Sequence, residues 1–360
     1  DETYYAKDAW TLLHFGYEAS WPQGADAQVA AGTTNIWTLQ PGTDLPQASF
    51  IVHPQLGKWL IAIGEQLFGM NSFGWRFGAL VFGSLLIAVT IRMARRLSRS
   101  TLIGGLAGLF LCVDGLSFVM SRIALLDVFE AFFTVAAVSA WLADRDWFRR
   151  KLADHLRANS LANLGGHYGP LLLFRPWRLA SGVLFGLAMG SKWNAVYVLA
   201  VFGVLSVIVD WRTRRTAGAD RSAAWSIVRD GGAAFMQLVV VAIPVYFATW
   251  WSWLATSGGW DRQWGAQHPD STLVKLFGKD FASLLWYHKE IYDFHTGDWI
   301  AHQGHVYAAH PFGWPWVGRV IGIDAVNDIQ PGTDGCTAVH DTCLRVISGQ
   351  GTPLLWWSAA

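Results

Sequence analysis

Apolar stretches of near-spanning length recur along the chain, with short polar segments between them. Three of them follow one another at 73–91, 101–119 and 125–143, and two more cover 179–209 and 233–255. A transmembrane helix needs about 20 consecutive, mainly apolar residues. The pattern therefore predicts an all-α polytopic membrane protein built around a bundle of transmembrane helices.

Long polar segments flank this predicted bundle, which we place at 73–255. Residues 1–72 form a first outer segment, and residues 256–352 form a larger one rich in Trp, His and Gly. At 353–360 the sequence becomes apolar again, which predicts the start of a further transmembrane helix. We expect the chain to be cut from a longer protein, with a membrane span before its first residue and more after its last.

The first outer segment ends in a stretch with helical periodicity, PQLGKWLIAIGEQLFGM at 54–70. Lys58 and Glu65 interrupt the apolar face of this stretch. An amphipathic helix of this kind is typical of a membrane interface. We therefore predict an interfacial helix here rather than a span.

Composition excludes an ordinary soluble enzyme, because 52% of the residues are hydrophobic and only 15% are charged. Soluble domains carry about 25% charged residues. Three linkers, at 92–100, 144–178 and 210–230, hold 16 of the 27 Lys and Arg but only 6 of the 26 Asp and Glu. Basic linkers lie on the cytoplasmic side of membranes. The acidic, His-rich and Trp-rich segments are therefore predicted to face outward from the cell membrane.

The run at 179–209 has basic linkers on both sides, so both of its ends should lie on the cytoplasmic side. Divided at GSKWN (190–194), each half would be a helix of roughly 18–25 Å, short for a hydrocarbon core of about 30 Å. We predict two short helices that meet near the outer leaflet, with Lys192 where they meet.

Four ionisable residues lie at or near predicted membrane depth: Arg122, Asp127, Glu130 and Lys192. Such groups are costly in lipid and suggest a site or a pathway. Arg and Lys at the outer membrane edge suit the phosphate of a lipid whose tail lies in the bilayer. Alternatively, Arg122 pairs with Asp127 in a structural ion pair and Lys192 extends its ammonium to the interface.

The adjacent acids Asp1 and Glu2 open the chain. Neighbouring carboxylates repel each other, which raises one pKa and suits a general base that deprotonates a hydroxyl group. The alternative is a pair of solvated acids.

The 256–352 segment offers three further residue types of interest. Its five His at 288–310 lack the tight spacing of a zinc motif, which favours hydrogen-bonded or substrate-contacting His. Cys336 and Cys343 allow a disulfide in an oxidising compartment, and two unpaired thiols are the alternative. Six Trp suit either sugar stacking or packing, and for most of them we expect packing: Trp260, Trp264, Trp286, Trp299, Trp314 and Trp316.

Six segments occur in a recognisable order over nearly all of 1–320. They are DETYYAKDAW, HPQLGKWLIAIG, SRIALLDVFEAFF, GLAMGSKWNAVY, YHKEIYDFHTG and HPFGWPWVGR. The ordered set resembles the bacterial, actinobacterial-type protein O-mannosyltransferases. The resemblance implies a GT-C-type transmembrane bundle with extracytoplasmic loops. It also implies an inverting glycosyltransferase that moves mannose from a polyprenyl-phosphate carrier to Ser or Thr of a protein.

The resemblance also implies roles for individual residues. Asp1 matches the base that takes the acceptor proton, Glu2 matches a residue that shapes the acceptor or sugar subsite, and Arg122 and Lys192 match the lipid-phosphate grip. Lower-ranked substrate contacts are His53, Lys58, Asp127, His288, His295, Trp314 and Arg319.

The sequence departs from the family pattern in two places. Gln55 stands where the common form of the first-loop motif has a second Pro, which we expect to alter the turn more than the chemistry. The segment at 256–352 has no room for the β-trefoil insertions of eukaryotic members. Acceptor selection is therefore expected to depend on this compact segment itself.

The implied partners are polyprenyl-phosphate-mannose, membrane lipids, and secreted or membrane acceptor proteins met during Sec translocation, with no nucleic acid. The sequence identifies no metal-ligating residues and leaves the metal requirement open, and the lipid-linked mannose donor is the one small molecule implied. One alternative is another GT-C lipid-linked sugar transferase with a glycan or lipid acceptor. Another is a transporter or channel, which predicts paired interrupted helices, whereas only the run at 179–209 is interrupted.

Overall fold

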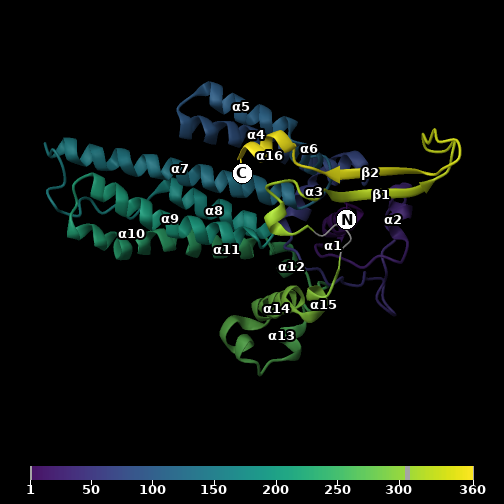
Figure 1. Cartoon of the computed structure of the whole chain (residues 1–360). Coiled ribbons are helices and arrows are strands. Elements are labelled where there is room, and N and C mark those ends of the chain that lie inside the picture. The colour runs from purple at the N-terminus through teal and green to yellow at the C-terminus, as the bar shows by residue number, and fades with distance from the viewer. Residues whose placement is uncertain (1, 305–308, 360) are drawn as a thin grey trace.

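The computed structural model describes residues 2–304 and 309–359, which are mostly helical (Figure 1). The predicted helical class is therefore confirmed. The helices of the first half are α1 (Glu2–Phe15), α2 (Ala25–Ala30), α3 (Leu56–Phe68), α4 (Ser72–Ser98), α5 (Thr101–Val113), α6 (Gly115–Met120) and α7 (Asp127–Ala158).

The second half begins with helices that pack along α7 and continues into a separate lobe and a hairpin. Its helices, including short 3-10 and π turns, are α8 (Pro176–Ser191), α9 (Ala195–Thr216), η1 (Arg221–Ala224), α10 (Trp225–Phe235), η2 (Met236–Val240), α11 (Val241–Ala248), α12 (Trp251–Ala255), α13 (Trp264–Gln267), α14 (Thr272–Thr296), α15 (Asp298–Ala301), η3 (Pro311–Gly313) and α16 (Pro353–Ala359). The strands are β1 (Ile321–Ile329) and β2 (Cys343–Gly349).

A membrane helix bundle forms the body of the protein. Helix α8 lies between α7 and α11, and α9 packs against α10 (Figure 1). Among the described residues, three helical segments are long and apolar enough to cross a bilayer: α4, α9 and the continuous run Arg221–Ala248. These spans identify the chain as a membrane protein.

Close packing in the bundle depends on glycines of α8. A Cβ at Gly182 would lie 2.0 Å from the Gln237 carbonyl oxygen, and one at Gly190 would lie 2.6 Å from Cγ2 of Thr249. Small residues at this spacing let two membrane helices approach closely. The end of α8 next to Lys192 is thereby held against Thr249, which directly follows the run Arg221–Ala248.

The predicted break at 190–194 is confirmed, because α8 ends at Ser191 and α9 begins at Ala195. Helix α9 is longer than predicted, with 22 residues. The predicted span at 101–119 is instead two helices that meet at Asp114, whose carboxylate caps α6 by accepting a hydrogen bond from the Ser117 amide at 3.0 Å. Helix α7 continues well beyond the predicted end at 143.

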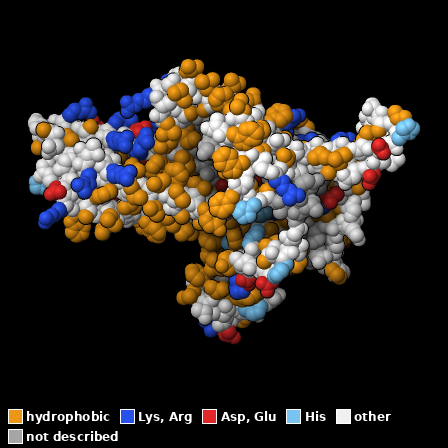
Figure 2. Space-filling view, viewed as in Figure 1, with side chains coloured by type: hydrophobic (Ala, Val, Ile, Leu, Met, Phe, Trp, Pro, Cys, Tyr) orange, Lys and Arg blue, Asp and Glu red, His pale blue; other side chains and the backbone are white. Residues whose placement is uncertain are grey.

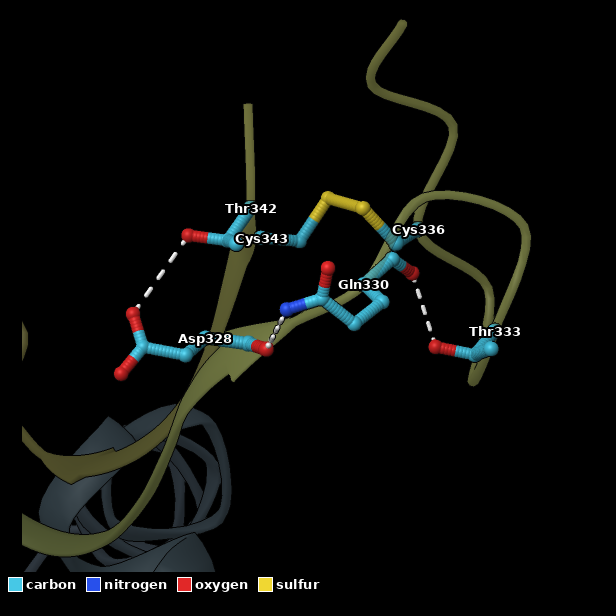
Figure 3. Close-up of a disulfide and its surroundings, with 6 residues drawn as sticks. All are labelled: Asp328, Gln330, Thr333, Cys336, Thr342 and Cys343. Atoms are coloured by element: carbon cyan, nitrogen blue, oxygen red, sulfur yellow. Dashed lines mark hydrogen bonds between the residues drawn. A yellow bond between two sulfur atoms is a disulfide. The ribbon is translucent and has the colours of Figure 1, made fainter. Parts of the chain in front are cut away.

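The predicted outer segment at 256–352 contains a lobe made by α13, α14 and α15 and a long β1–β2 hairpin (Figure 1). The sequence analysis did not predict these strands. They pair antiparallel, with register shifts that interrupt the ladder. The disulfide between Cys336 and Cys343 is confirmed and closes the tip of the hairpin (Figure 3).

The C-terminal segment is helical from Pro353, as predicted, and α16 packs beside α5 and α6. Asp114 holds it there, because its Oδ1 accepts hydrogen bonds from the Thr352 amide at 2.8 Å and from Nε1 of Trp356 at 2.9 Å. Whether α16 begins a membrane span stays a prediction.

Charge separates the two ends of the bundle. Lys and Arg gather at the end formed by the C-terminal turns of α4, α7 and α9, whereas His side chains gather toward the other end, across an apolar belt (Figure 2). We call the first the basic end. The second carries the N-terminus of α7 and the break between α8 and α9, and we call it the site end.

Candidate active site

The first turn of α1 is fastened to the site end by Glu2. Its two carboxylate oxygens accept hydrogen bonds from Nε and Nη2 of Arg76 at 2.7 and 2.6 Å. Oε1 also accepts one from the Ala124 amide at 3.0 Å. Glu2 thus joins α1 to the first turns of α4 and to the segment just before α7. The predicted base Asp1 lies outside the described residues.

An ion pair between Asp127 and Lys192 joins the N-terminus of α7 to the break after α8. The distance from Nζ of Lys192 to Oδ1 of Asp127 is 2.7 Å, and the two side chains are 27% and 42% exposed. A pair this accessible gains little free energy from its own attraction. An incoming anion can therefore compete for the ammonium.

Arg122 lies in the short segment between α6 and α7 and is exposed. Its guanidinium carbon lies 4.5 Å from the centre of the Phe118 ring, a cation–π contact. Within 2–304 and 309–359 its side chain makes no ion pair or hydrogen bond. The alternative of an Arg122–Asp127 pair is therefore wrong for this structure, in which Asp127 is paired with Lys192.

Trp193, directly after Lys192, belongs to a chain of hydrogen bonds that reaches α14. Its Nε1 donates to the Tyr246 hydroxyl at 2.8 Å, and that hydroxyl lies 2.7 Å from Nε2 of His288. Nδ1 of His288 donates to the Leu284 carbonyl at 2.7 Å. Every donor in this series of hydrogen bonds has an acceptor when His288 is neutral and protonated on Nδ1, with the Tyr246 hydroxyl donating to Nε2.

His53, in the loop before α3, lies between Tyr5 of α1 and His295 of α14. Its ring centre lies 6.1 Å from that of Tyr5 and 5.9 Å from that of His295. Burial, and then the positive charges of Lys58 and Lys192, lower the pKa of His53 to about 3. His53 is therefore neutral at physiological pH and offers one donor and one acceptor.

The position of His53 is set by α14. The Tyr287 hydroxyl donates to the Ile51 carbonyl at 2.8 Å and accepts from the Ile51 amide at 3.1 Å. Nε2 of His295 lies 3.1 Å from the Val52 carbonyl, which accepts its hydrogen. These contacts hold the loop before α3 against the lobe.

Together these contacts close a ring. From α1, Glu2 reaches the 122–127 segment, Asp127 reaches Lys192, and the adjacent Trp193 lies 5.9 Å from His295 between ring centres. His295 meets His53, which returns to Tyr5 of α1. We call this set the contact ring. It unites the predicted residues Glu2, His53, Asp127, Lys192, His288 and His295.

Lys58 does not meet the expectation of a substrate contact, because its side chain is fully buried. Its ammonium lies 3.0 Å from Oδ2 of Asp8 and 3.1 Å from Oε1 of Glu18. Burial raises the pKa of the Asp8 carboxyl, against the opposing attraction of Lys58. Breaking a buried cluster of this kind is costly, so Lys58 holds α3 to α1.

Gln55, the departure from the family motif, is part of the same core. It donates to Oε2 of Glu18 at 2.8 Å and accepts from the Ser252 hydroxyl at 2.9 Å. A proline has neither group. The departure therefore adds two buried hydrogen bonds rather than only altering a turn.

Helix α3 differs from the predicted interfacial helix in its polar face. Lys58 and Glu65 both point inward, and Glu65 is 1% exposed, with neither carboxylate oxygen hydrogen-bonded within the described part of the chain. Burial raises the pKa of Glu65 to about 9. A neutral carboxylic acid explains how α3 tolerates this residue inside the protein.

Trp314 lies away from the contact ring. Trp314 lines an apolar cavity of about 740 Å³ beside α5 and α16. Arg319 lies between η3 and β1.

Within the lobe, Trp264 stacks on Trp286 with ring centres 4.6 Å apart, and Trp260 donates to Oε2 of Glu290 at 3.1 Å. These three Trp serve packing, as expected for most of the group.

Sequence reasoning missed Arg76, Trp193 and Tyr246. Arg76 follows the predicted start of a span, and Trp193 stands within the recognised GSKWN break. Tyr246 lies in an apolar run, and only its hydroxyl group indicated that it could form hydrogen bonds. No cluster of three or more His, Cys, Asp or Glu able to hold a metal occurs in the described ranges 2–304 and 309–359.

A pH test follows from the neutral His288, which burial gives a pKa of about 4. An unfolded His has a pKa of about 6.5. Between these values the unfolded chain binds a proton that the folded protein excludes, so stability is complete above about pH 6.5 and falls as the pH drops toward 4. We expect the thermal midpoint in detergent to fall from pH 7 to 5, and His288→Gln to reduce that fall.

The exposed His268 supplies the matched control, because His268→Gln should leave the pH dependence as in wild type. His53 titrates in the same direction, so part of the fall should remain in His288→Gln. An identical fall in His288→Gln and wild type would contradict the assignment of a neutral, buried His288.

The fold and the contact ring define a helical membrane protein with an ionisable site at one end of its bundle. Residues 47–156 match the family described as dolichyl-phosphate-mannose-protein mannosyltransferase. The chain is also similar over essentially its whole length to actinobacterial proteins of that kind. Residues 47–156 therefore carry the domain of the protein mannosyltransferase family, and the whole chain is similar to proteins of that name.

Three curated relatives show the extent of the similarity, and each is named polyprenol-phosphate-mannose–protein mannosyltransferase. The one from Mycobacterium tuberculosis is 35% identical over 361 residues, covering 100% of this chain and 63% of the relative. The one from Mycolicibacterium smegmatis is 34% identical over 363 residues, with 100% and 64% covered. The one from Corynebacterium glutamicum is 32% identical over 364 residues, with 99% and 64% covered. The chain thus spans a little under two thirds of these relatives. No solved structure matches it.

Proposed function

We propose that the protein transfers mannose from polyprenyl-phosphate-mannose to Ser or Thr hydroxyls of exported proteins, with inversion at the sugar. The observation that carries the proposal is the contact ring, which gathers acids, a cation and neutral His at the site end. The names of the relatives support the donor and the protein acceptor.

In this proposal Lys192 and Arg122 bind the donor phosphate. The Lys192 ammonium has only an accessible carboxylate as its partner, and Arg122 has only an aromatic ring among the described residues. Both stand close to the membrane helices, where a lipid-linked phosphate would arrive. Asp127 holds Lys192 in place until the phosphate competes for it.

Asp1 acts as the general base. It directly precedes Glu2, which is tied to the segment between Arg122 and Asp127. As the acceptor oxygen bonds to the anomeric carbon, its proton passes to the Asp1 carboxylate and the bond from that carbon to the phosphate oxygen breaks. The electron pair leaves with polyprenyl phosphate, whose developing charge Lys192 and Arg122 stabilise.

The mannose lies among the aromatic and imidazole rings of the site end. The neutral His53 offers hydrogen bonds without adding charge beside the phosphate, and Trp193 offers a flat apolar surface held by Tyr246. Sugar hydroxyl groups fit this mixture of polar edges and aromatic faces. Glu2 borders the acceptor or sugar subsite and is positioned by Arg76.

The site end faces the extracytoplasmic side of the cell membrane in this proposal. Its support is the excess of Lys and Arg at the opposite end, since basic segments stay on the cytoplasmic side. The Cys336–Cys343 disulfide fits the same orientation. Acceptors would then be secreted or membrane proteins, met in unfolded form during Sec translocation.

A transfer assay tests the proposal directly. Membranes containing the protein are given labelled polyprenyl-phosphate-mannose with a Ser/Thr peptide, the same peptide with Val and Ala at those positions, or a glycan acceptor. We expect label only in the Ser/Thr peptide, because the peptide hydroxyl is the nucleophile. Label in the glycan and not in the peptide would overturn the protein acceptor and favour another GT-C lipid-linked sugar transfer.

A further inference from the structure

A groove at the basic end, far from the contact ring, has a positively charged part and an apolar part, as a lipid-binding site does. It lies between α4, α7 and α8 and has a volume of about 640 Å³. That size falls within the roughly 300–1,000 Å³ of ligand pockets. We call it the arginine groove.

One part of the arginine groove is positively charged. Arg92, Arg95, Arg96 and Arg99 lie along it, at the spacing that places side chains on one face of a helix. Arg96 is 3.1 Å from Oδ2 of Asp146, a carboxylate that also contacts Arg145. The groove's one carboxylate is therefore already neutralised.

The other three arginines are exposed, and their side chains make no hydrogen bond or ion pair with residues 2–304 or 309–359. Three buried arginines at this end behave differently. Arg175, Arg178 and Arg214 are buried, and each is paired with at least one carboxylate. The groove thus places three arginines that have no carboxylate partner among the described residues beside its apolar walls.

The other part of the groove is apolar. Ala136, Ala140 and Ala143 of α7 form one wall, and Trp177 and Leu184 of α8 form the other. Trp177 is 45% exposed and lies in the first turn of α8, a position typical of a membrane–water interface. The apolar walls continue from the arginines toward the middle of the bundle.

We propose that the arginine groove binds an anionic glycerophospholipid from the leaflet at the basic end. Its headgroup phosphate lies against Arg92, Arg95 and Arg99, and an acyl chain follows the walls made by α7 and α8. Basic pockets between membrane helices bind acidic lipid headgroups in this way. Inorganic phosphate would leave the apolar walls empty, and a zwitterionic lipid would not match the net charge.

Bound lipid is measured by native mass spectrometry of the detergent-solubilised protein. The protein is offered phosphatidylglycerol, phosphatidylcholine with the same acyl chains, undecaprenyl phosphate or inorganic phosphate. We expect wild type to retain phosphatidylglycerol at least tenfold more than phosphatidylcholine, and to gain thermal stability with it. Equal retention of the two phospholipids would overturn the proposal, as would retention of undecaprenyl phosphate alone.

Two triple variants locate the site. Arg92→Gln/Arg95→Gln/Arg99→Gln removes the groove charges, and Arg150→Gln/Lys151→Gln/Arg221→Gln removes three exposed charges outside the groove. Each arginine near an acidic lipid contributes about fivefold in affinity, so the groove variant should bind about a hundredfold more weakly. The control should bind as wild type does, and equal losses in both variants would assign the effect to general surface charge and overturn the groove.

Discussion

Replacing Asp1 with Asn is expected to slow mannose transfer by about 10²–10⁴-fold while leaving donor binding close to wild type. A positioned general base contributes a factor of this size. Asparagine keeps the shape of the side chain but cannot accept the proton of the acceptor hydroxyl. Initial rates with labelled donor and a Ser/Thr peptide give the transfer, and retention of the labelled donor on the protein gives the binding.

Asp44→Asn is the matched control, because Asp44 is an exposed acid in the same 1–72 segment. We expect it to change neither quantity. Near-normal turnover in Asp1→Asn would remove Asp1 from the role of base. Loss of donor binding together with transfer would instead place Asp1 in the phosphate or sugar subsite.

Periodicity and charge predicted the parts of the fold that repeat along the sequence. The break beside Lys192 could be inferred because basic linkers flank 179–209, and the structure has the break at that place. The ends of the helices were harder to predict from the sequence. Helix α7 runs past residue 143 into the basic linker at 144–178, where Asp144 is buried by other helices.

The pairing of buried charges was not predictable from spacing. Lys58 interrupts an apolar face, which in sequence indicates an exposed residue, yet Asp8 and Glu18 enclose it. Both partners come from α1 or the loop after it and meet Lys58 only through the tertiary fold. Glu65 shows the same limit, since a neutral buried acid looks like a charged surface acid in the sequence.

Some residues of the candidate site were predicted from the sequence, and others were missed. His53, His288 and His295 were nominated through a family resemblance, and the structure brings them together with Lys192 and Asp127. Trp193 and Tyr246 were missed because each looks like ordinary apolar packing. Only the hydrogen bonds from Trp193 through Tyr246 to His288 show that they orient the site.

At the basic end, four buried charges hold three helices together. Arg175 and Arg178 of the segment that begins α8 lie between Asp144 of α7 and Asp210 of α9. The nitrogen–oxygen distances are 2.7–3.0 Å, and the four side chains are 1–2% exposed. These residues belong to the linkers that the sequence indicated as basic and cytoplasmic.

Removing Asp144 from this cluster is therefore expected to destabilise the protein strongly. Asp144→Ala leaves Arg175 and Arg178 buried with only Asp210 as a carboxylate partner, and such a change costs about 3–5 kcal/mol. Asp154→Ala on the same helix is the control: Asp154 is 53% exposed and paired with Arg157, and exposed pairs contribute about 0–1 kcal/mol. Thermal unfolding in detergent measures both. Equal midpoints for Asp144→Ala and Asp154→Ala would show that the buried cluster does not hold α7, α8 and α9 together.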